Sequence, residues 1–389
     1  TGTRVNEDYL IEDVPYNLAS YSESFNNWTK FGTPTIEDNN IIAPNGTLTG
    51  AKVTRGSNAT PLRLSNVTFL NQEYTFSVYA KKGNHNQINL DIGDVSNATY
   101  TLTDDWQRFT VTSTPTANTH IDITLPSSSS GDFIYIWGAQ VVKGDKPKEY
   151  LKTTDRLDIP RIDYTNGEPS ILLEPSRTNL VSNSVDFTTN WTAQGITLTA
   201  NQITSPDGNT NGSLIQSTST GSCVFEPSGL SLTIGVTYTY SFFVKKGNNQ
   251  WVRLAHISSG VTGCWFDLDN GVVGTVNSES ATIDKYPNGW YRITNTFVAT
   301  HSSSGNSAFI GICDNNGSTN AGVIGQNVYI YGAQVEEGSY STSLIHTSGS
   351  AVTRSADYAD NAGNNDLFND SEGVLYAEIK ALADDLTNR

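Results

Sequence analysis

The chain has 389 residues, enough for two or three domains with cores of their own. Only 16% of the residues are charged and the net charge is −16, so the sequence lacks the cationic surface that a nucleic-acid backbone or an anionic lipid surface requires. No apolar run approaches the ~20 residues of a membrane span and no signal peptide is visible, so we expect no nucleic-acid partner and no membrane insertion.

The first half of the chain predicts a β-sandwich. Residues 1–14 are predicted as a connector strand or hairpin. Residues 15–150 hold several runs in which aromatic and β-branched residues alternate with small polar ones, such as YTFSVYAKKG (74–83) and HIDITLP (120–126). Clusters of Pro, Asn, Gly and Ser separate these runs, which is typical of short strands packed in two sheets.

A linker over 151–175 follows. It contains IDYTNGEPSILLE (162–174), which predicts a strand, an Asn-Gly turn and a second strand. The N-terminal connector is a shorter relative of this segment.

The second half repeats the first. YIWGAQVVKG (135–144) and YIYGAQVEEG (329–338) are identical at seven of ten positions, and three earlier segments match in the same order. The repeat is therefore a whole domain, and residues 176–348 are predicted as a second sandwich. Its Lys-Lys-Gly element and the next Trp element are twenty residues farther apart than in the first copy. We expect the aromatic residues that open the copies in the two cores: Phe25, Trp28, Phe187 and Trp191.

Residues 349–389 are predicted as a linker and the opening of a further domain. The segment SEGVLYAEIKAL (371–382) has the alternation of a first strand, and only seven residues follow it in the sequence.

Together these motifs resemble bacteriophage tail-fibre and related virion structural proteins. Each copy is similar to carbohydrate-binding modules of the jelly-roll type, and SEGVLYAEIKA resembles the first strand of concanavalin A-like (laminin G-like) lectin domains. The resemblance implies an all-β chain of two tandem jelly-roll β-sandwiches with hairpin connectors and the beginning of a third, lectin-like sandwich. It also implies a place on the surface of a virion, in the tail or another appendage, other virion proteins as partners, and a homo-oligomer, a trimer by analogy.

No catalytic motif stands out. None of the five histidines belongs to an HExxH motif or a Cys/His cluster, and GxSxG is absent from the sequence. A polysaccharide hydrolase or lyase could use two carboxylates, such as those of Asp267, Asp269 and Asp284, but acidic residues are common in this chain. We expect no enzyme activity.

Candidate ligand-binding residues lie in the second copy. Under strict alternation Trp251 and Arg253 share one face of their strand and His256 falls on the opposite face, while Trp265 and Asp267 form a second pair. An exposed aromatic ring with polar groups beside it is what a sugar ring requires.

The alternative is that Trp251 packs in the core. Aligned by sequence, Ile88 stands at its position in the first copy, and an aliphatic residue in such a strand is usually buried.

Calcium is the cofactor that the resemblance raises. Jelly-roll modules of this kind often hold a structural Ca²⁺ through carboxylate and carbonyl oxygens. The candidate ligands lie in Asp-containing turns: Asp207, Asp267, Asp269 and Asp314. Ordinary turn chemistry is the alternative explanation for these residues.

The three cysteines, Cys223, Cys264 and Cys313, show no metal-binding spacing. We expect small buried thiols, with a single Cys223–Cys264 or Cys264–Cys313 disulfide as the alternative.

These observations predict a non-enzymatic adhesion component that binds host-surface polysaccharide. Weak contacts in each module would be strengthened by multivalency when several copies are displayed together. The alternatives are a virion spacer or decoration protein that binds no sugar, the non-catalytic part of a polysaccharide depolymerase, and a secreted bacterial adhesin.

Overall fold

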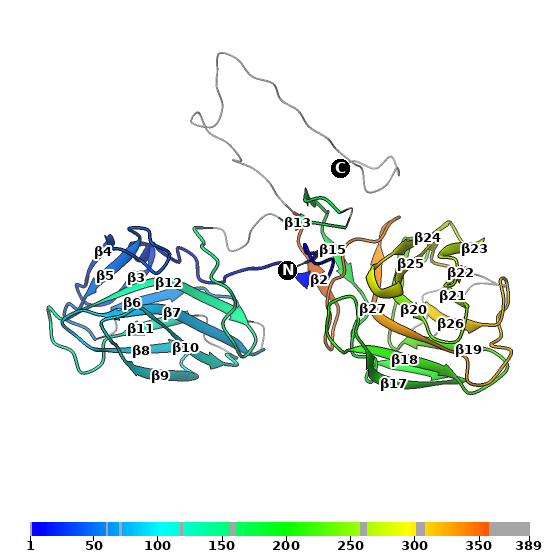
Figure 1. Ribbon diagram of the computed structural model, residues 1–389, viewed down its shortest axis with the longest axis horizontal. Helices are drawn as coiled ribbons and strands as arrows, with labels where there is room; N and C mark the ends of the chain where they lie inside the picture. The colour runs from blue at the N-terminus through cyan, green and yellow to red at the C-terminus, as the bar shows by residue number, and fades with distance from the viewer. Residues whose placement is uncertain are drawn as a thin grey trace, which may run out of the picture. The chain divides into compact units, whose positions relative to one another are not determined.

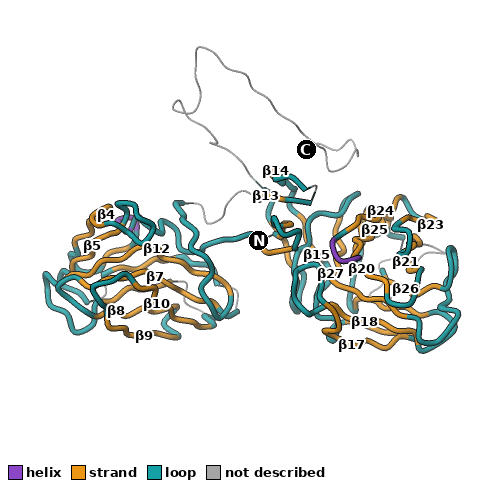
Figure 2. The backbone as a smooth tube through the Cα atoms, viewed as in Figure 1, coloured by secondary structure: helices purple, strands orange, loops and turns teal. Residues whose placement is uncertain are grey.

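The computed structural model describes residues 2–59, 61–69, 72–116, 120–155, 161–165, 167–256, 263–300 and 308–357. Regular structure in these residues is β-strand apart from single 3-10 turns at Phe25–Asn27 and Pro287–Gly289 (Figure 2). The predicted all-β fold is confirmed. None of the helical pieces in the described ranges has the length of a membrane span.

The chain forms two compact units (Figure 1). One unit is Pro15–Ile159. The other contains Pro160–Arg389 and also Thr1–Val14, so the N-terminal connector belongs with the second half of the chain. The predicted opening of a third, lectin-like domain lies outside the described residues.

The first unit is a jelly-roll sandwich. Its strands are β3 (Thr29–Lys30), β4 (Thr35–Ile41), β5 (Gly50–Thr54), β6 (Leu62–Ser65), β7 (Tyr74–Lys82), β8 (Gln87–Ile92), β9 (Ser96–Thr101), β10 (Gln107–Ser113), β11 (His120–Thr124) and β12 (Phe133–Lys143). They form two antiparallel sheets in the orders β10-β7-β12-β5-β4 and β3-β6-β11-β8-β9. Without the edge strands β3 and β4, this is the eight-stranded jelly-roll order.

The second sandwich has the same connectivity. Its strands are β16 (Trp191–Gln194), β17 (Ile196–Ile203), β18 (Gly212–Ser217), β19 (Cys223–Pro227), β20 (Thr237–Lys246), β21 (Trp251–Ala255), β22 (Gly263–Asp267), β23 (Val272–Asn277), β24 (Ser280–Lys285), β25 (Trp290–Val298), β26 (Phe309–Cys313) and β27 (Asn327–Glu337). The sheet orders are β16-β19-β26-β21-β22-β23 and β17-β18-β27-β20-β25-β24. The additional residues of this copy supply β23 and β24, one at the edge of each sheet.

Period-two alternation builds both cores. In β8 the residues Ile88, Leu90 and Ile92 are fully buried between the sheets, while the residues between them face outward. The expected core aromatics Phe25, Trp28 and Phe187 are buried. Trp191 is half-buried and stacks on Phe225, with 4.9 Å between ring centroids.

A buried asparagine in each sandwich explains why the sequence GAQV occurs twice, at 138–141 and 332–335. In the first sandwich the Asn17 side chain donates to the carbonyls of Ala139 and Leu151 and accepts from the amides of Ala19 and Val141. All four distances are 2.9 Å. One side chain thus joins the start of the domain, its last strand and the chain that leaves it. We call this set of four bonds the asparagine clasp.

The second sandwich repeats the clasp. Asn179 donates to the carbonyls of Ala333 and Ile345 and accepts from the amides of Val181 and Val335. The glycine before each of these alanines, Gly138 or Gly332, lies at a bulge in the last strand and has φ near +60°. Residues with a Cβ atom rarely adopt this φ angle. The bulge lets the strand reach the clasp.

The connectors pack against the second sandwich. Strands β1 (Thr3–Val5) and β2 (Ile11–Asp13) form a hairpin, and a short hairpin of β13 (Ile162–Asp163) and β14 (Ser170–Ile171) lies in the predicted linker. Strand β28 (Val352–Arg354) pairs with β15 (Arg177–Asn179). The apolar side of the N-terminal hairpin lies over four buried residues: Phe243, Trp290, Tyr331 and Leu344.

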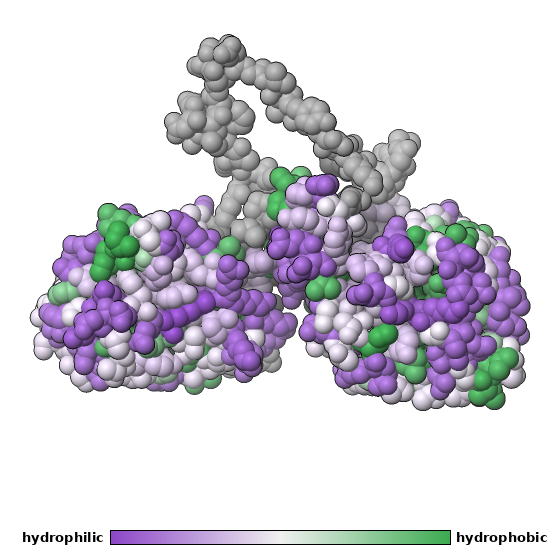
Figure 3. Space-filling model, viewed as in Figure 1, coloured by the Kyte–Doolittle hydropathy of each residue, from purple (hydrophilic) through white to green (hydrophobic). Residues whose placement is uncertain are grey.

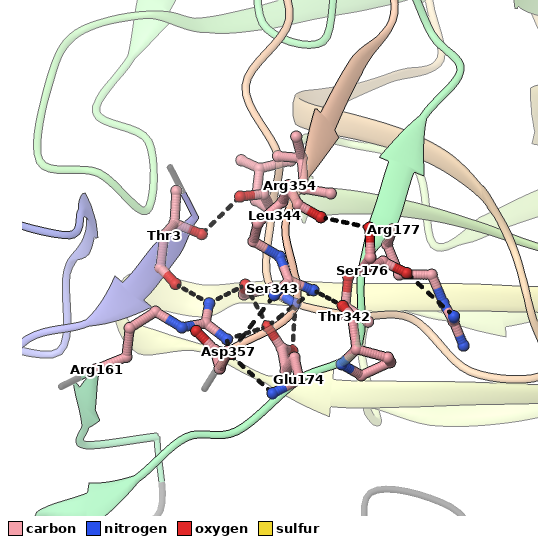
Figure 4. A network of polar contacts seen from close by, with 12 residues as sticks. Thr3, Arg161, Glu174, Ser176, Arg177, Thr342, Ser343, Leu344, Arg354 and Asp357 are labelled. Carbon is pink, nitrogen blue, oxygen red and sulfur yellow. Dashed lines mark hydrogen bonds and ion pairs between the residues drawn. The ribbon is translucent and has the colours of Figure 1, made fainter. Parts of the chain in front are cut away.

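A buried network of ions holds these connectors (Figure 4). The Glu174 carboxylate accepts from Arg161 at 2.5 Å and from the amide and hydroxyl of Ser343 at 2.7 Å, and Arg354 lies 3.5 Å away. Arg161 also donates to the carbonyl of Thr3 in the hairpin. Burial favours the neutral acid, but the charges of the two arginines outweigh it and lower the pKa of Glu174.

We predict that Asn179→Ala lowers the free energy of unfolding of the second sandwich by about 2–4 kcal/mol, because two amides and two carbonyls lose their partners in the interior. Denaturant unfolding followed by tryptophan fluorescence measures this change. Asn17→Ala is the matched variant and should destabilise the first sandwich instead. A loss below about 0.5 kcal/mol in both variants would show that the clasp contributes little.

We predict that Glu174→Gln destabilises the second unit by about 3 kcal/mol, because Arg161 and Arg354 would stay buried with only one of their two carboxylates, that of Asp357. Hydrogen exchange should accelerate at the β1 and β2 amides. The control is Glu12→Gln, which breaks a more exposed ion pair with Arg4 in the same hairpin. Equal exchange in both variants would exclude this role for Glu174.

Candidate functional site

The four predicted ligand-binding residues lie in one block on the outer face of the second sandwich. Antiparallel pairing of β21 with β22 places Trp251 opposite Asp267 and Arg253 opposite Trp265. The residues that alternate with them point into the core: Val252, Leu254, Cys264 and Phe266. The two pairs expected from the sequence are therefore neighbours on adjacent strands. We call these four residues the outer block.

The alternative that Trp251 is a core residue is wrong. Counted from the glycine of the Lys-Lys-Gly element, Trp251 corresponds to Gln87, and Val252 takes the buried place of Ile88. The two loops confirm this register, because His85 and Asn249 both donate their amides to the carbonyl at the start of the last strand. Trp251 is half-buried at the outer surface.

Gly274 of strand β23 makes room for the Trp251 indole. A Cβ atom at this position would lie 2.7 Å from an atom of the ring, so another residue here would displace it. Beside the ring, the exposed Asn316 accepts the amide of Thr275 through its side-chain carbonyl.

The other tryptophan of the outer block is closed to solvent. Trp265 has no exposed surface, and its indole N–H donates to the carbonyl of Ser318 at 2.6 Å. Residues 314–322 thus lie over this part of the sheet. A sugar ring could stack on Trp265 only if this loop moved, so Trp251 is the accessible aromatic group of the block.

Arg253 lies beneath the surface between two aromatic rings. It is 6% exposed, and its guanidinium carbon is 5.8 Å from the ring centroid of Trp265 and 5.0 Å from that of Phe309. Its Nε atom is buried and has no hydrogen-bond partner among the described residues. Burial lowers the pKa of Arg253. Sequence analysis missed Phe309, although FIGIC (309–313) has the alternation that places it on this face.

Asp267 is committed to a turn. Its carboxylate accepts from the side chains of Gln250 and Asn270 and from the amides of Asp269 and Asn270. Burial opposes ionisation, but these bonds outweigh it and lower the pKa of Asp267. Because these four groups occupy its oxygens, Asp267 shapes the loop and has little hydrogen-bonding capacity left for a ligand.

The four predicted calcium ligands do not come together. Asp207 accepts from three groups of its own turn and from Tyr331, Asp269 pairs with Lys246, and Asp314 accepts from Asn315. Together with Asp267, they form no common set of metal-ligand atoms among the described residues. Turn chemistry accounts for the positions of Asp207 and Asp267, while the carboxylate of Asp269 is held by an ion pair.

A different titratable cluster lies on the first sandwich. Ligand atoms of Asp91, Asp94, His120 and Asp122 lie within 4.8 Å of one another. Arg63 binds both oxygens of Asp122 at 2.6 and 2.7 Å, so an arginine already neutralises one of these carboxylates. Sequence analysis missed the cluster, because its residues come from separate strands and one hairpin turn.

His256 faces away from the outer block, as predicted. Its ring stacks on Phe297, a core residue, with 4.1 Å between centroids and 9° between planes. Burial lowers the pKa of His256 to about 4.

All three cysteines are buried free thiols, so the expected state is confirmed and neither alternative disulfide is present. Burial raises the pKa of Cys264 to about 11 and that of Cys313 to about 12. Such thiols are poor nucleophiles at neutral pH.

No protein-family model matches the chain, and there is no match among the curated proteins. Among solved structures, the N-terminal CBM22-1-CBM22-2 tandem domain of Paenibacillus barcinonensis Xyn10C is similar at 15% identity, with a TM-score of 0.30, over 84% of this chain and 98% of that chain. The CBM22-1-GH10 modules of the Clostridium thermocellum endo-1,4-beta-D-xylanase 10B, in complex with xylohexaose, are similar at 18% identity. That match has a TM-score of 0.27 and covers 44% of this chain and 30% of the other.

An anti-sigma factor domain-containing protein is similar at 10% identity with a TM-score of 0.17, over 71% of this chain and 84% of that one. At these identities and TM-scores the three similarities carry no argument about function. The assignment of the jelly-roll fold rests on the strand order itself.

We predict that the second sandwich becomes less stable as the pH falls from about 6.5 to about 4. In this window the unfolded chain protonates His256, while the folded chain keeps it neutral, so protons favour unfolding. The loss should be about 3 kcal/mol. In His256→Phe, which keeps an aromatic ring against Phe297, this part of the pH dependence should vanish. Identical pH profiles of unfolding free energy in the two proteins would rule out His256 as the cause.

Proposed function

We propose that the chain is a non-catalytic carbohydrate-binding protein and that it binds sugar at the outer block of the second sandwich. The observation that carries this proposal is the half-buried Trp251 on the outer face of β21, with a guanidinium two residues along the same strand. The C–H face of a pyranose ring packs well on an indole, and polar groups at its rim select the hydroxyls.

The surroundings of Trp251 suit this role. Asn316 is exposed, and since its carbonyl oxygen is bound to Thr275, its NH₂ group is turned to other partners. The first sandwich has Gln87 at the equivalent place, so it has no aromatic ring at that position. We therefore place the binding site in the second copy alone.

The carboxylates favour binding over catalysis. A glycoside hydrolase needs two carboxyl groups that face one bond of the substrate. Asp267 is saturated by its turn, and Asp269 is paired with Lys246. These commitments argue against the depolymerase alternative for this part of the sandwich.

The biological setting that we propose is adhesion by a bacteriophage. The resemblance to tail-fibre proteins and the duplication of a non-catalytic module support a virion component that attaches to host-surface polysaccharide. Display in a homo-oligomer, a trimer by analogy, on the tail or another appendage would multiply weak contacts.

The visible surface favours adhesion over a pure spacer. On the face shown in Figure 3, hydrophilic residues predominate and apolar residues form small separate patches. A spacer that packs on neighbouring subunits would bury larger apolar areas.

We predict that the full chain binds at least one bacterial or algal polysaccharide saturably and that Trp251→Ala weakens this binding about five- to thirtyfold, because a stacked ring contributes about 1–2 kcal/mol. A polysaccharide panel followed by isothermal titration measures it. Trp106→Ala removes another half-buried tryptophan, in the first sandwich, and should leave the affinity unchanged. Absence of binding across the panel would favour the spacer.

A further inference from the structure

Arg253 is a buried cation without a buried anion. Two other buried arginines of the described chain, Arg161 and Arg354, share the carboxylates of Glu174 and Asp357, and a third, Arg292, donates to the hydroxyl of Ser241. Arg253 makes no ion pair and no hydrogen bond within the described ranges, and its neighbours are the rings of two aromatic residues. The chain has 39 acidic residues against 23 basic ones, so a lack of carboxylates does not explain the missing partner.

A buried charge without an anion is unfavourable, and charged groups in such surroundings cluster at functional sites. A guanidinium stays protonated at neutral pH even where burial lowers its pKa. The site therefore carries a positive charge with no anion of the described chain beside it.

The aromatic rings hold the guanidinium in one place. Trp265 and Phe309 pack against it, and the indole of Trp265 is itself fixed by the carbonyl of Ser318. Gly311, opposite Arg253 on strand β26, has no side chain, and a Cβ added there would lie 3.6 Å from Nε. The planar fork is thus preorganised, which favours a planar carboxylate that binds through both oxygens.

Trp251, which lies beside Arg253, indicates the class of ligand. Trp251 is on the same face of β21, two residues or about 7 Å away, which is close to the width of one sugar unit. A ligand that stacks on Trp251 would therefore place a substituent of the same or the next ring near Arg253. Within an acidic polysaccharide that substituent is the carboxylate of a uronic acid.

We propose that the outer block binds an acidic polysaccharide, with Arg253 pairing with the carboxylate of a uronic acid unit while Trp251 stacks on a ring of the chain. This inference rests on the proposed function and adds the class of sugar. The first sandwich should not share this property, because Asn89 stands in place of Arg253 and the arginine on that face, Arg63, is already bound to Asp122.

The test compares acidic polymers with their neutral forms. The full chain is titrated with polygalacturonate and alginate, and with the same polymers after methyl esterification of their carboxyl groups. We expect at least one acidic form to bind at least tenfold more tightly than its ester. In Arg253→Leu this preference should disappear, and Arg253→Lys should restore only part of it, because an ammonium lacks the planar fork. The control is Arg63→Leu, which should keep the full preference.

The outcomes separate this inference from the proposed function. Equal binding of acid and ester forms, with binding still dependent on Trp251, would overturn the acidic class and leave carbohydrate binding in place. Stronger binding of a sulfated galactan than of either uronate polymer would overturn the inference that Arg253 pairs with a carboxylate. No binding of any polysaccharide would overturn both proposals. Even if an Arg253 variant fails to fold, the ratio of acid to ester affinities in the unmodified protein shows whether the ligand is an acidic polysaccharide.

Discussion

Each sandwich depends on one buried side-chain amide that joins three separate segments. The side chains of Asn17 and Asn179 each donate two hydrogen bonds and accept two from backbone amides. All four bonds must form, because an unpaired polar group in the interior costs free energy. The clasp fixes where the chain enters, where the last strand bends and where the chain leaves. Its neighbours must then also be kept: a glycine that adopts positive φ, and small residues that let the segments approach. The segment that contains GAQV therefore occurs twice because each sandwich has its own asparagine clasp.

Much of this fold could be predicted from the sequence, because alternation and repetition are local signals. The strands, the two sandwiches and the outward pairs of β21 and β22 follow from them. The position of Trp251 relative to the first copy was misjudged by one residue. Matching the Asn-Gln letters of the two copies aligns Trp251 with Ile88, whereas the backbone bonds of His85 and Asn249 align it with Gln87. Since side chains alternate, a slip of one residue exchanges core and surface.

Other features lay beyond the sequence because they depend on distant segments. The burial of Trp265 comes from a loop some fifty residues later, which supplies the carbonyl of Ser318. Phe309, the second ring against Arg253, lies equally far along the chain. The N-terminal hairpin packs on the second sandwich through an ion network centred on Glu174, and no local pattern in residues 1–14 indicates that destination.

The two copies keep the same interior and differ on their outer faces, and this division explains how a duplicated domain can acquire a role. On the first sandwich an arginine and an aspartate neutralise each other on adjacent strands, Arg63 and Asp122. On the second, the cation at Arg253 is flanked by aromatic rings and forms no ion pair with any residue that the structure describes. Because the clasp and the core bear the stability of each copy, residues outside them can change at little cost to folding. Arg253 and its aromatic neighbours lie in this part of the second copy, outside the clasp and the core.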